Sequence, residues 1–168
     1  MKNERPKIKV PLETLDMIIE LINISILMLL VAYTIMNYIE LPEKIATHFN
    51  AKGEADGFGQ KSTIWLLPGI AIILYIMMIF INRFPHLHNF MVNITEENAL
   101  KNYQLSTRIV RFTNLFCLIL FTLITYEIIE SSKGNENNVL GIPFFIFTLV
   151  VPLLGIAFVF YYQRKINS

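Results

Sequence analysis

Four long runs of apolar residues, separated by polar segments, dominate the chain. They cover residues 17–39, 64–82, 110–129 and 140–162. A bilayer core about 30 Å thick is crossed by roughly 20 helical residues, because each residue adds about 1.5 Å. We therefore expect an all-α, polytopic integral membrane protein with four transmembrane helices, folded as a single domain over residues 1–168.

Lysine and arginine residues are distributed unevenly between the two sides of these predicted helices. Cytoplasmic segments of membrane proteins carry the excess of positive charge. We therefore expect both termini and the loop at residues 83–109 in the cytoplasm, and the loop at residues 40–63 outside, in a bacterial cytoplasmic (inner) membrane. Ten basic residues fall on the first side, Lys2, Arg5, Lys7, Lys9, Arg83, Lys101, Arg108, Arg111, Arg164 and Lys165, and four on the other, Lys44, Lys52, Lys61 and Lys133.

The cytoplasmic loop contains a pattern typical of a helix start. Thr95 precedes two glutamates, so it can act as an N-cap with acidic residues in the first turn. We expect a short cytoplasmic helix from there into the third span, with Arg108 and Arg111 at the level of the lipid headgroups.

Few ionisable residues lie within the apolar runs, and all lie near their ends. Asp16 and Glu20 are one helical turn apart at the start of the first run, and Glu127 is close to the end of the third. A charge deep in a bilayer indicates function, but charges near an interface cost much less. We interpret these three as solvated helix ends.

Composition supports the membrane assignment and excludes several classes of function. Hydrophobic residues make up 54% of the chain and charged residues 16%, whereas soluble domains are roughly a quarter charged. The net charge of +1 argues against a nucleic-acid-binding surface. The lone Cys117 permits no intramolecular disulfide. The first apolar run is long and lacks a cleavage site, so we expect a retained helix.

The outer loop concentrates the residues that carry chemistry. Three glycines within seven residues and the segments Asn50–Gly53 and Asp56–Gly57 predict turns, so we expect an ordered loop folded onto the helix ends. Candidate ligand-binding residues are Pro42, His48, Asn50, Gly53, Asp56 and Lys61.

Three hypotheses fit this loop. His48, Glu54 and Asp56 could bind a divalent metal, although no HExxH spacing accompanies them. His48 and Asp56 could form an acid–base pair, with Lys61 anchoring an anion, in a membrane enzyme. The favoured hypothesis is structural: Asn50 and Asp56 cap turns, Lys61 pairs with a carboxylate, His48 bonds to backbone, and the rigid loop recognises a ligand.

The same loop carries a family resemblance. Leu41-Pro42, Ile45, His48-Phe49-Asn50, Gly53, Asp56 and Lys61, followed by an apolar span, resemble the bacterial membrane domain of unknown function number sixteen-forty-eight. The stretch from Ile94 to Arg108, ITEENALKNYQLSTR, is similar to the segment that follows it in free-standing members.

That domain also forms the N-terminal part of SdpI-type immunity proteins, which protect a cell from a secreted killing peptide and signal at the membrane. SdpI-type proteins have further spans beyond four. The resemblance therefore implies a non-enzymatic, SdpI-like membrane protein that needs no cofactor and recognises a secreted peptide or a lipid at its outer face. A homo-oligomer is compatible with it, and a small transporter is the third alternative.

Overall fold

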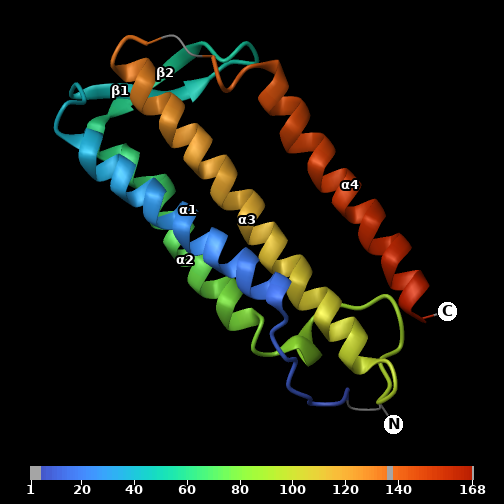
Figure 1. Cartoon of the computed structure of the whole chain (residues 1–168). Coiled ribbons are helices and arrows are strands. Elements are labelled where there is room, and N and C mark those ends of the chain that lie inside the picture. The colour runs from blue at the N-terminus through green and yellow to red at the C-terminus, as the bar shows by residue number, and fades with distance from the viewer. Residues whose placement is uncertain (1–4, 136–137, 168) are drawn as a thin grey trace.

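Four long helices form the body of the molecule in this computed structural model, which describes residues 5–135 and 138–167. They are α1 (Thr14–Tyr38), α2 (Leu66–Ile81), α3 (Ala99–Ser132) and α4 (Ile142–Asn167). The described segment before α1 and the end of α4 both lie toward one end of the bundle, which we call the terminal end (Figure 1). Within the described residues four helices are long and apolar enough to cross a membrane, α2 being counted with the short 3-10 helix η1 (Lys61–Trp65) before it. The prediction of four such helices is confirmed.

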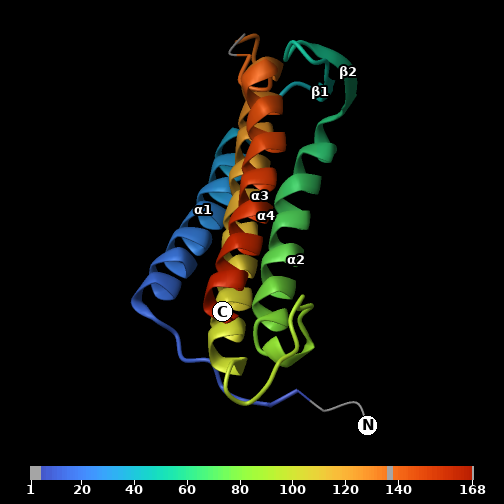
Figure 2. The same cartoon turned by 90° about the vertical axis from the view of Figure 1, so that its right-hand side faces the viewer.

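The prediction of an all-α fold is wrong at the loop between α1 and α2. Strands β1 (Lys44–Phe49) and β2 (Ala55–Gln60) form an antiparallel hairpin there, which lies across the end of the bundle opposite the termini, the hairpin end (Figures 1 and 2). The predicted turn at Asn50–Gly53 is confirmed, because the Gly53 amide donates to the Asn50 carbonyl at 2.9 Å. The predicted turn at Asp56–Gly57 is wrong, since both residues lie within β2.

Helix α3 is longer than the predicted third span. It runs without interruption for 34 residues, or roughly 51 Å at 1.5 Å per residue, so the expected cytoplasmic helix and the span are one helix. Its N-cap is Asn98 and not Thr95. Thr95 instead lies one turn earlier, where its carbonyl accepts from the Ala99 amide and its amide donates to Asn98 Oδ1. A second 3-10 turn, η2 (Pro85–Leu87), lies in the connection from α2.

A buried apolar cluster joins α1, α2 and α3 near their middle. It consists of Leu27, Leu30, Ala71, Tyr75 and Leu118, and Leu30 is fully buried. Three helices therefore form a packed core.

The interpretation of Asp16 and Glu20 as solvated helix ends is wrong, because both pair with arginines of α3. Arg108 Nε donates to Asp16 Oδ1 at 2.9 Å, and Arg108 Nη2 donates to Glu13 at 2.8 Å. Arg111 lies 3.7 Å from Asp16 and 3.5 Å from Glu20. Asp16 is only 3% exposed. Because a buried charge requires a partner, these residues form a charged link between α1 and α3 instead of facing the headgroups.

Hydrogen bonds extend this charged link toward α2 and along α3. The Tyr75 hydroxyl donates to Glu20 Oε1 at 3.0 Å, and Asn23 Nδ2 donates to the Arg111 carbonyl at 3.2 Å. Polar side chains on facing helices stabilise helix packing in apolar surroundings. The terminal halves of α1, α2 and α3 are thus joined by polar contacts, and their middle by apolar ones.

A second apolar cluster, the hairpin-base cluster, fixes the hairpin to the helix ends. It consists of Leu41, Ile45, Ile64, Ile128 and Ile129. The Ala46 amide adds a hydrogen bond of 3.2 Å to Ser132 Oγ, at the last residue of α3. The hairpin is therefore a docked element and not a free loop.

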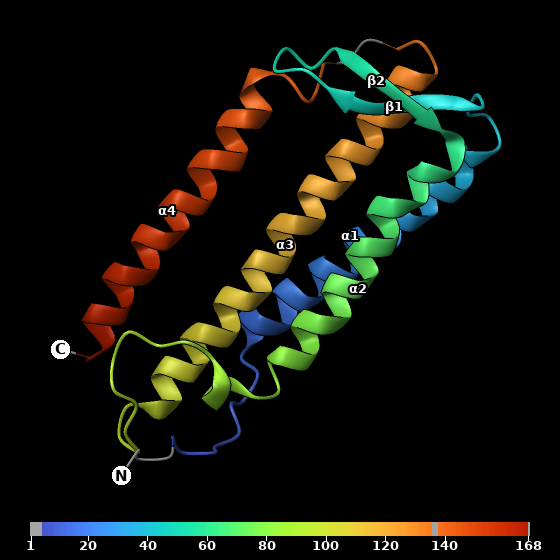
Figure 3. The same cartoon turned by 180° about the vertical axis from the view of Figure 1, so that it is seen from behind.

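Helix α4 is attached near its two ends, and its ribbon lies apart from those of the other helices along much of its length (Figure 3). At the terminal end, Asn167 forms reciprocal amide hydrogen bonds with Asn102, at 3.0 and 3.1 Å. At the hairpin end, the Val139 amide donates to Glu127 Oε2 at 3.0 Å, and Glu127 is 1% exposed, so the interpretation of Glu127 as a solvated end is also wrong. Within the described residues, none of the apolar window of α4 is buried.

Replacing Asp16 with Asn should destabilise the protein by about 3–5 kcal/mol, because it leaves two partly buried arginines without their shared carboxylate. Glu13→Gln is the control: Glu13 meets the same Arg108, but its side chain is 52% exposed. Such an exposed pair contributes less than about 1 kcal/mol. Unfolding by detergent titration measures both, and equal losses for the two variants would contradict the buried link.

Replacing Gly53 with Ala should loosen the hairpin from α4. An added Cβ would lie 2.9 Å from the Gly141 amide nitrogen, and the Gly53 φ of +83° disfavours any side chain. Gly134→Ala is a matched control, because its φ is +88° and nothing lies within 4 Å of the added Cβ. Both variants lose about 1 kcal/mol from backbone conformation. Gly53→Ala should lose more in a thermal unfolding measurement, and equal melting temperatures would show that the close contact is absent.

Candidate functional site

A cavity of about 190 Å³ lies beneath the hairpin, between α3 and α4. Its wall brings together three segments that are far apart in the sequence. We call it the hairpin pocket, and it is lined by Thr47, His48 and Phe49 of β1, Ile124 and Ile128 of α3, and Leu140, Phe144 and Phe145 at the start of α4. Its walls are mostly apolar, and the strand supplies the polar groups.

An irregularity in β1 brings three consecutive residues to this pocket. In a regular strand, successive side chains point to opposite faces. The register of β1 with β2 shifts between Ala46 and His48 and again between His48 and Phe49, which indicates a bulge. Such a bulge re-aims side chains, and here Thr47, His48 and Phe49 all reach the same cavity.

His48 is held at the rim of the pocket by Asp56. The two side chains are in direct contact through His48 Nδ1 and Asp56 Oδ1, and they are 71% and 47% exposed. Gly57 lies opposite His48 in the hairpin, where a Cβ would come within 2.8 Å of the His48 Cβ. The glycine is therefore required for close packing next to His48. His48 bonds to a carboxylate, so the expectation of a backbone partner is wrong.

Asn50 and Gly53 build the turn of the hairpin. Asn50 Oδ1 accepts from the Lys52 amide at 2.8 Å and from the Glu54 amide at 3.1 Å. Asn50 Nδ2 donates to Glu54 Oε2 at 2.8 Å. The predicted turn-capping role of Asn50 is confirmed, and Glu54 is directed to the turn.

The described structure does not assemble the metal site predicted from His48, Glu54 and Asp56. His48 and Asp56 contact each other, but the Glu54 carboxylate bonds to Asn50. In the part of the chain that the structure describes, no group of three His, Cys, Asp or Glu side chains is placed to hold a metal ion. The sequence alone could not show that the Glu54 side chain bonds to Asn50 within the turn.

Lys61 stabilises the end of α1 and does not line the pocket. Its Nζ donates to the carbonyls of Leu41 at 2.8 Å and Ile39 at 3.3 Å, and lies 4.9 Å from the Tyr38 ring centroid. A cation at a helix C-terminus satisfies carbonyls that have no partner within the helix. The expected pairing of Lys61 with a carboxylate is therefore wrong. Pro42 is exposed in the connection between α1 and β1.

A surface ion pair closes the same end of the bundle. Lys133 Nζ donates to Glu40 Oε2 at 2.6 Å and to Asn37 Oδ1 at 2.7 Å. The Lys133 ammonium lowers the pKa of the Glu40 carboxyl below its usual value. The pair therefore contributes stability when the pH lies above the ordinary glutamate pKa, and the contribution is lost as the pH falls through the lowered one. Since Glu40 is exposed, this contribution is small.

Of the six candidate ligand-binding residues, only His48 lines the hairpin pocket. Sequence reasoning missed the apolar wall, because Ile124, Phe144 and Phe145 come from runs that read as ordinary membrane helix. The dense aromatic start of the fourth run was the available indication. The assembled pocket suits an elongated apolar group that ends in a polar one, which would meet His48.

Comparisons with known proteins agree with the resemblance seen in the loop. Residues 25–72, from within α1 through the hairpin to the first turns of α2, match the family described as Domain of unknown function (DUF1648). An uncharacterized protein of Archaeoglobus fulgidus is 32% identical over 146 residues, which cover 79% of this chain and 80% of that protein. The similarity thus extends to an archaeon. No solved structure matches the chain. The chain belongs to the DUF1648 family of domains of unknown function.

Proposed function

We propose that the protein is a non-enzymatic membrane protein that binds a secreted, membrane-active peptide at the hairpin pocket, in the manner of an SdpI-type immunity or signalling protein. The observation that carries the proposal is the pocket itself. It joins the polar His48–Asp56 pair to an apolar wall from α3 and α4. A membrane-active peptide presents the same two properties, apolar side chains and polar backbone.

The exposed apolar surface of α4 supports an elongated ligand. Between its two attachments, α4 contacts α3 through the ring pair Phe116 and Phe147, whose centroids are 5.5 Å apart. Phe145, next to this pair in sequence, lines the pocket and is 47% exposed. An apolar segment that enters the pocket can therefore continue along α4.

The hairpin favours a peptide over a lipid. The sheet has two strands in the described residues, and β1 faces α3 through the hydrogen bond from Ala46 to Ser132. In the described sheet β2 has β1 as its only strand neighbour, and addition of a strand at the other edge is a common mode of peptide recognition. Phe58 of β2 is 66% exposed and would meet a peptide lying there.

The expected sidedness agrees with this function. The distribution of lysines and arginines predicts that the hairpin end lies outside the cytoplasm of an inner membrane. A secreted peptide would meet the hairpin pocket first. Recognition of this kind requires no cofactor and can be performed by a single chain or by a homo-oligomer.

A catalytic alternative is favoured by one observation, the contact between His48 and Asp56. A carboxylate that orients an imidazole is the arrangement of a general base. His48→Gln separates the two functions, because glutamine keeps a polar group at the rim but cannot transfer a proton at neutral pH. Peptide recognition should tolerate this change, whereas acid–base chemistry should not.

Filling the pocket should weaken recognition enough to remove protection. In a strain that lacks the gene, wild-type protein should restore survival against secreted peptide toxins, whereas Phe145→Trp should not, since the larger ring occupies the cavity. Phe158→Trp is the matched control, because Phe158 lies on α4 and stacks on Tyr162 at 5.7 Å, outside the pocket lining. Binding of the same peptide to purified protein should weaken about tenfold for Phe145→Trp, equivalent to ~1.4 kcal/mol.

Three results would contradict the proposal. They are unchanged sensitivity of the deletion strain, full protection by His48→Ala and Asp56→Ala variants, and equal loss of binding for the two tryptophan variants. Binding of extracted lipid without any binding of peptide would show that the hairpin pocket is a lipid site and not a peptide site.

A further inference from the structure

A second cavity, of about 250 Å³, lies at the terminal end of the bundle, far along the helices from the hairpin pocket. It is lined by Arg5, Lys7, His86 and Leu87. The first two residues belong to the segment before α1, and the other two belong to η2. Three of the four lining residues are basic, and we call this cavity the basic pocket.

Arg5 fixes the two walls of the basic pocket to each other. Its Nη1 donates to the His88 carbonyl at 2.6 Å and to the His86 carbonyl at 3.1 Å, and its guanidinium lies 5.2 Å from the Phe90 ring centroid. Nearby, the Tyr103 hydroxyl donates to the Pro6 carbonyl at 2.9 Å. The segment before α1 is thus held in place, and its positive charge is presented in a defined position.

Lys7 and His86 bring hydrogen-bond donors to this pocket that the described part of the chain does not use. Within the described residues, neither the Lys7 ammonium nor a ring nitrogen of His86 forms a hydrogen bond or ion pair. The His86 ring contacts Phe84 edge-on, at a centroid distance of 6.3 Å, which leaves its nitrogens available. Donors without partners next to a fixed guanidinium suit an anion with several oxygen acceptors.

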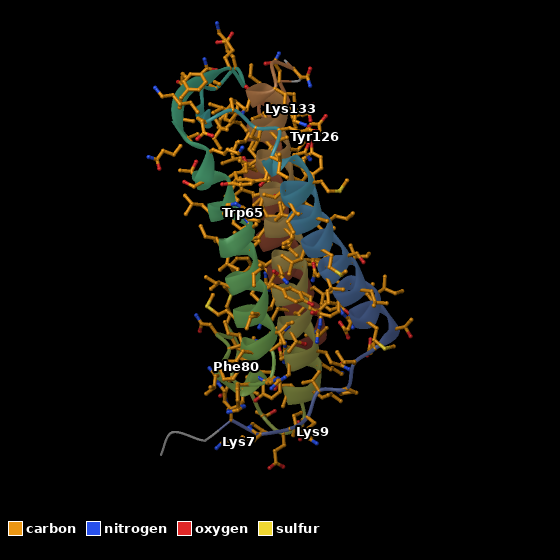
Figure 4. The ribbon with its side chains drawn as sticks, turned by 90° about the vertical axis from the view of Figure 1, so that its left-hand side faces the viewer. Lys7, Lys9, Trp65, Phe80, Tyr126 and Lys133 are labelled. Atoms are coloured by element: carbon orange, nitrogen blue, oxygen red, sulfur yellow. The ribbon has the colours of Figure 1, made fainter. Side chains whose placement is uncertain are left out.

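Apolar side chains continue from the same pocket toward α2, because Leu87 lines it and the His86 ring contacts Phe84, which in turn contacts Phe80. Leu87 is 72% exposed, Phe80 is 57% exposed, and the Phe80 and Phe84 rings are 5.2 Å apart. Figure 4 shows Phe80 near the terminal end of α2, with Lys7 beyond it at the same end of the molecule. Because the apolar run of α2 ends at Ile81, Lys7 would lie where lipid phosphates begin.

We propose that the basic pocket binds the phosphate headgroup of an anionic phospholipid, with Lys7 and His86 as donors, Arg5 as a fixed positive charge, and Leu87 and Phe80 against the glycerol and acyl carbons. A free phosphate would use the three basic residues but not the apolar ones. A lipid uses both sets, and anionic lipids concentrate basic segments at the membrane surface. This inference is independent of ligand recognition at the hairpin pocket.

The test uses the full-length protein in neutral nanodiscs made of phosphatidylcholine, to which phosphatidylglycerol is added in steps. Native mass spectrometry counts the anionic lipids that stay bound after release from the nanodisc. Wild-type protein should retain phosphatidylglycerol, and the double variant Lys7→Gln, His86→Gln should require at least fivefold more of it for the same occupancy. Lys101→Gln is the control, because Lys101 is an exposed lysine on the first turns of α3 and does not line the pocket.

Two results would overturn the proposal. One is equal retention of phosphatidylglycerol by wild type and the double variant, provided that both unfold at the same temperature in phosphatidylcholine alone. The other is displacement of the lipid by inorganic phosphate or glycerol phosphate at the same concentration, which would identify a site for soluble anions. Lys7 is exposed and His86 is half-buried, so neither substitution should disturb folding. The single variant Lys7→Glu is a second check, because its negative charge should weaken lipid retention more than the double variant does.

Discussion

The structure depends on the burial of five aliphatic side chains beneath the hairpin. The hairpin-base cluster takes Leu41 from the end of the α1 connection, Ile45 from β1, Ile64 from η1, and Ile128 and Ile129 from α3. Full burial of each such side chain contributes about 1.5–3 kcal/mol relative to exposure. A two-stranded hairpin alone is marginal in water, so this apolar contact is what orders it. The hairpin pocket exists only because β1 is held in this position.

At the other end of α1 and α3, ion pairs between the two helices hold them together. Asp16 accepts from Arg108 and lies close to Arg111, while Glu20 accepts from Tyr75. Polar groups in apolar surroundings must find partners within the protein, and those on facing helices fix how the helices are aligned. The three-helix core is therefore fastened at both ends by different interactions. Helix α4 is attached to this core near its ends and through the Phe116–Phe147 ring pair, and the hairpin pocket that the proposed peptide would use lies beside its first turns.

Much of this architecture could be predicted from short stretches of the sequence. Helices long enough to span a bilayer follow from runs of apolar residues, and the turn at Asn50–Gly53 follows from its residue types. The hairpin itself could not be derived, because β1 and β2 are short and β2 contains Gly57 and Gly59, which disfavour strands when considered alone. Only their pairing and the cluster below them make the strands stable.

Contacts between segments that are distant in sequence could not be predicted either. Asp16 was interpreted as solvated because nothing in its own helix shows that Arg108 lies opposite. The apolar wall of the hairpin pocket was invisible for the same reason, since Ile124 and Phe145 serve equally well facing lipid. The His48–Asp56 contact was one of three hypotheses drawn from residue chemistry, and the favoured one gave His48 a backbone partner instead. The role of Glu54 required the geometry of the turn.

The docked hairpin is tested most directly by hydrogen exchange at one backbone amide. The Ala46 amide donates to Ser132 Oγ of α3, so its protection reports the contact between hairpin and bundle. The account predicts slow exchange at Ala46 in nanodiscs, and much faster exchange in a Ser132→Ala variant whose other hairpin amides remain protected. Exchange at Ala46 in the wild-type protein as fast as in an unstructured peptide would contradict it.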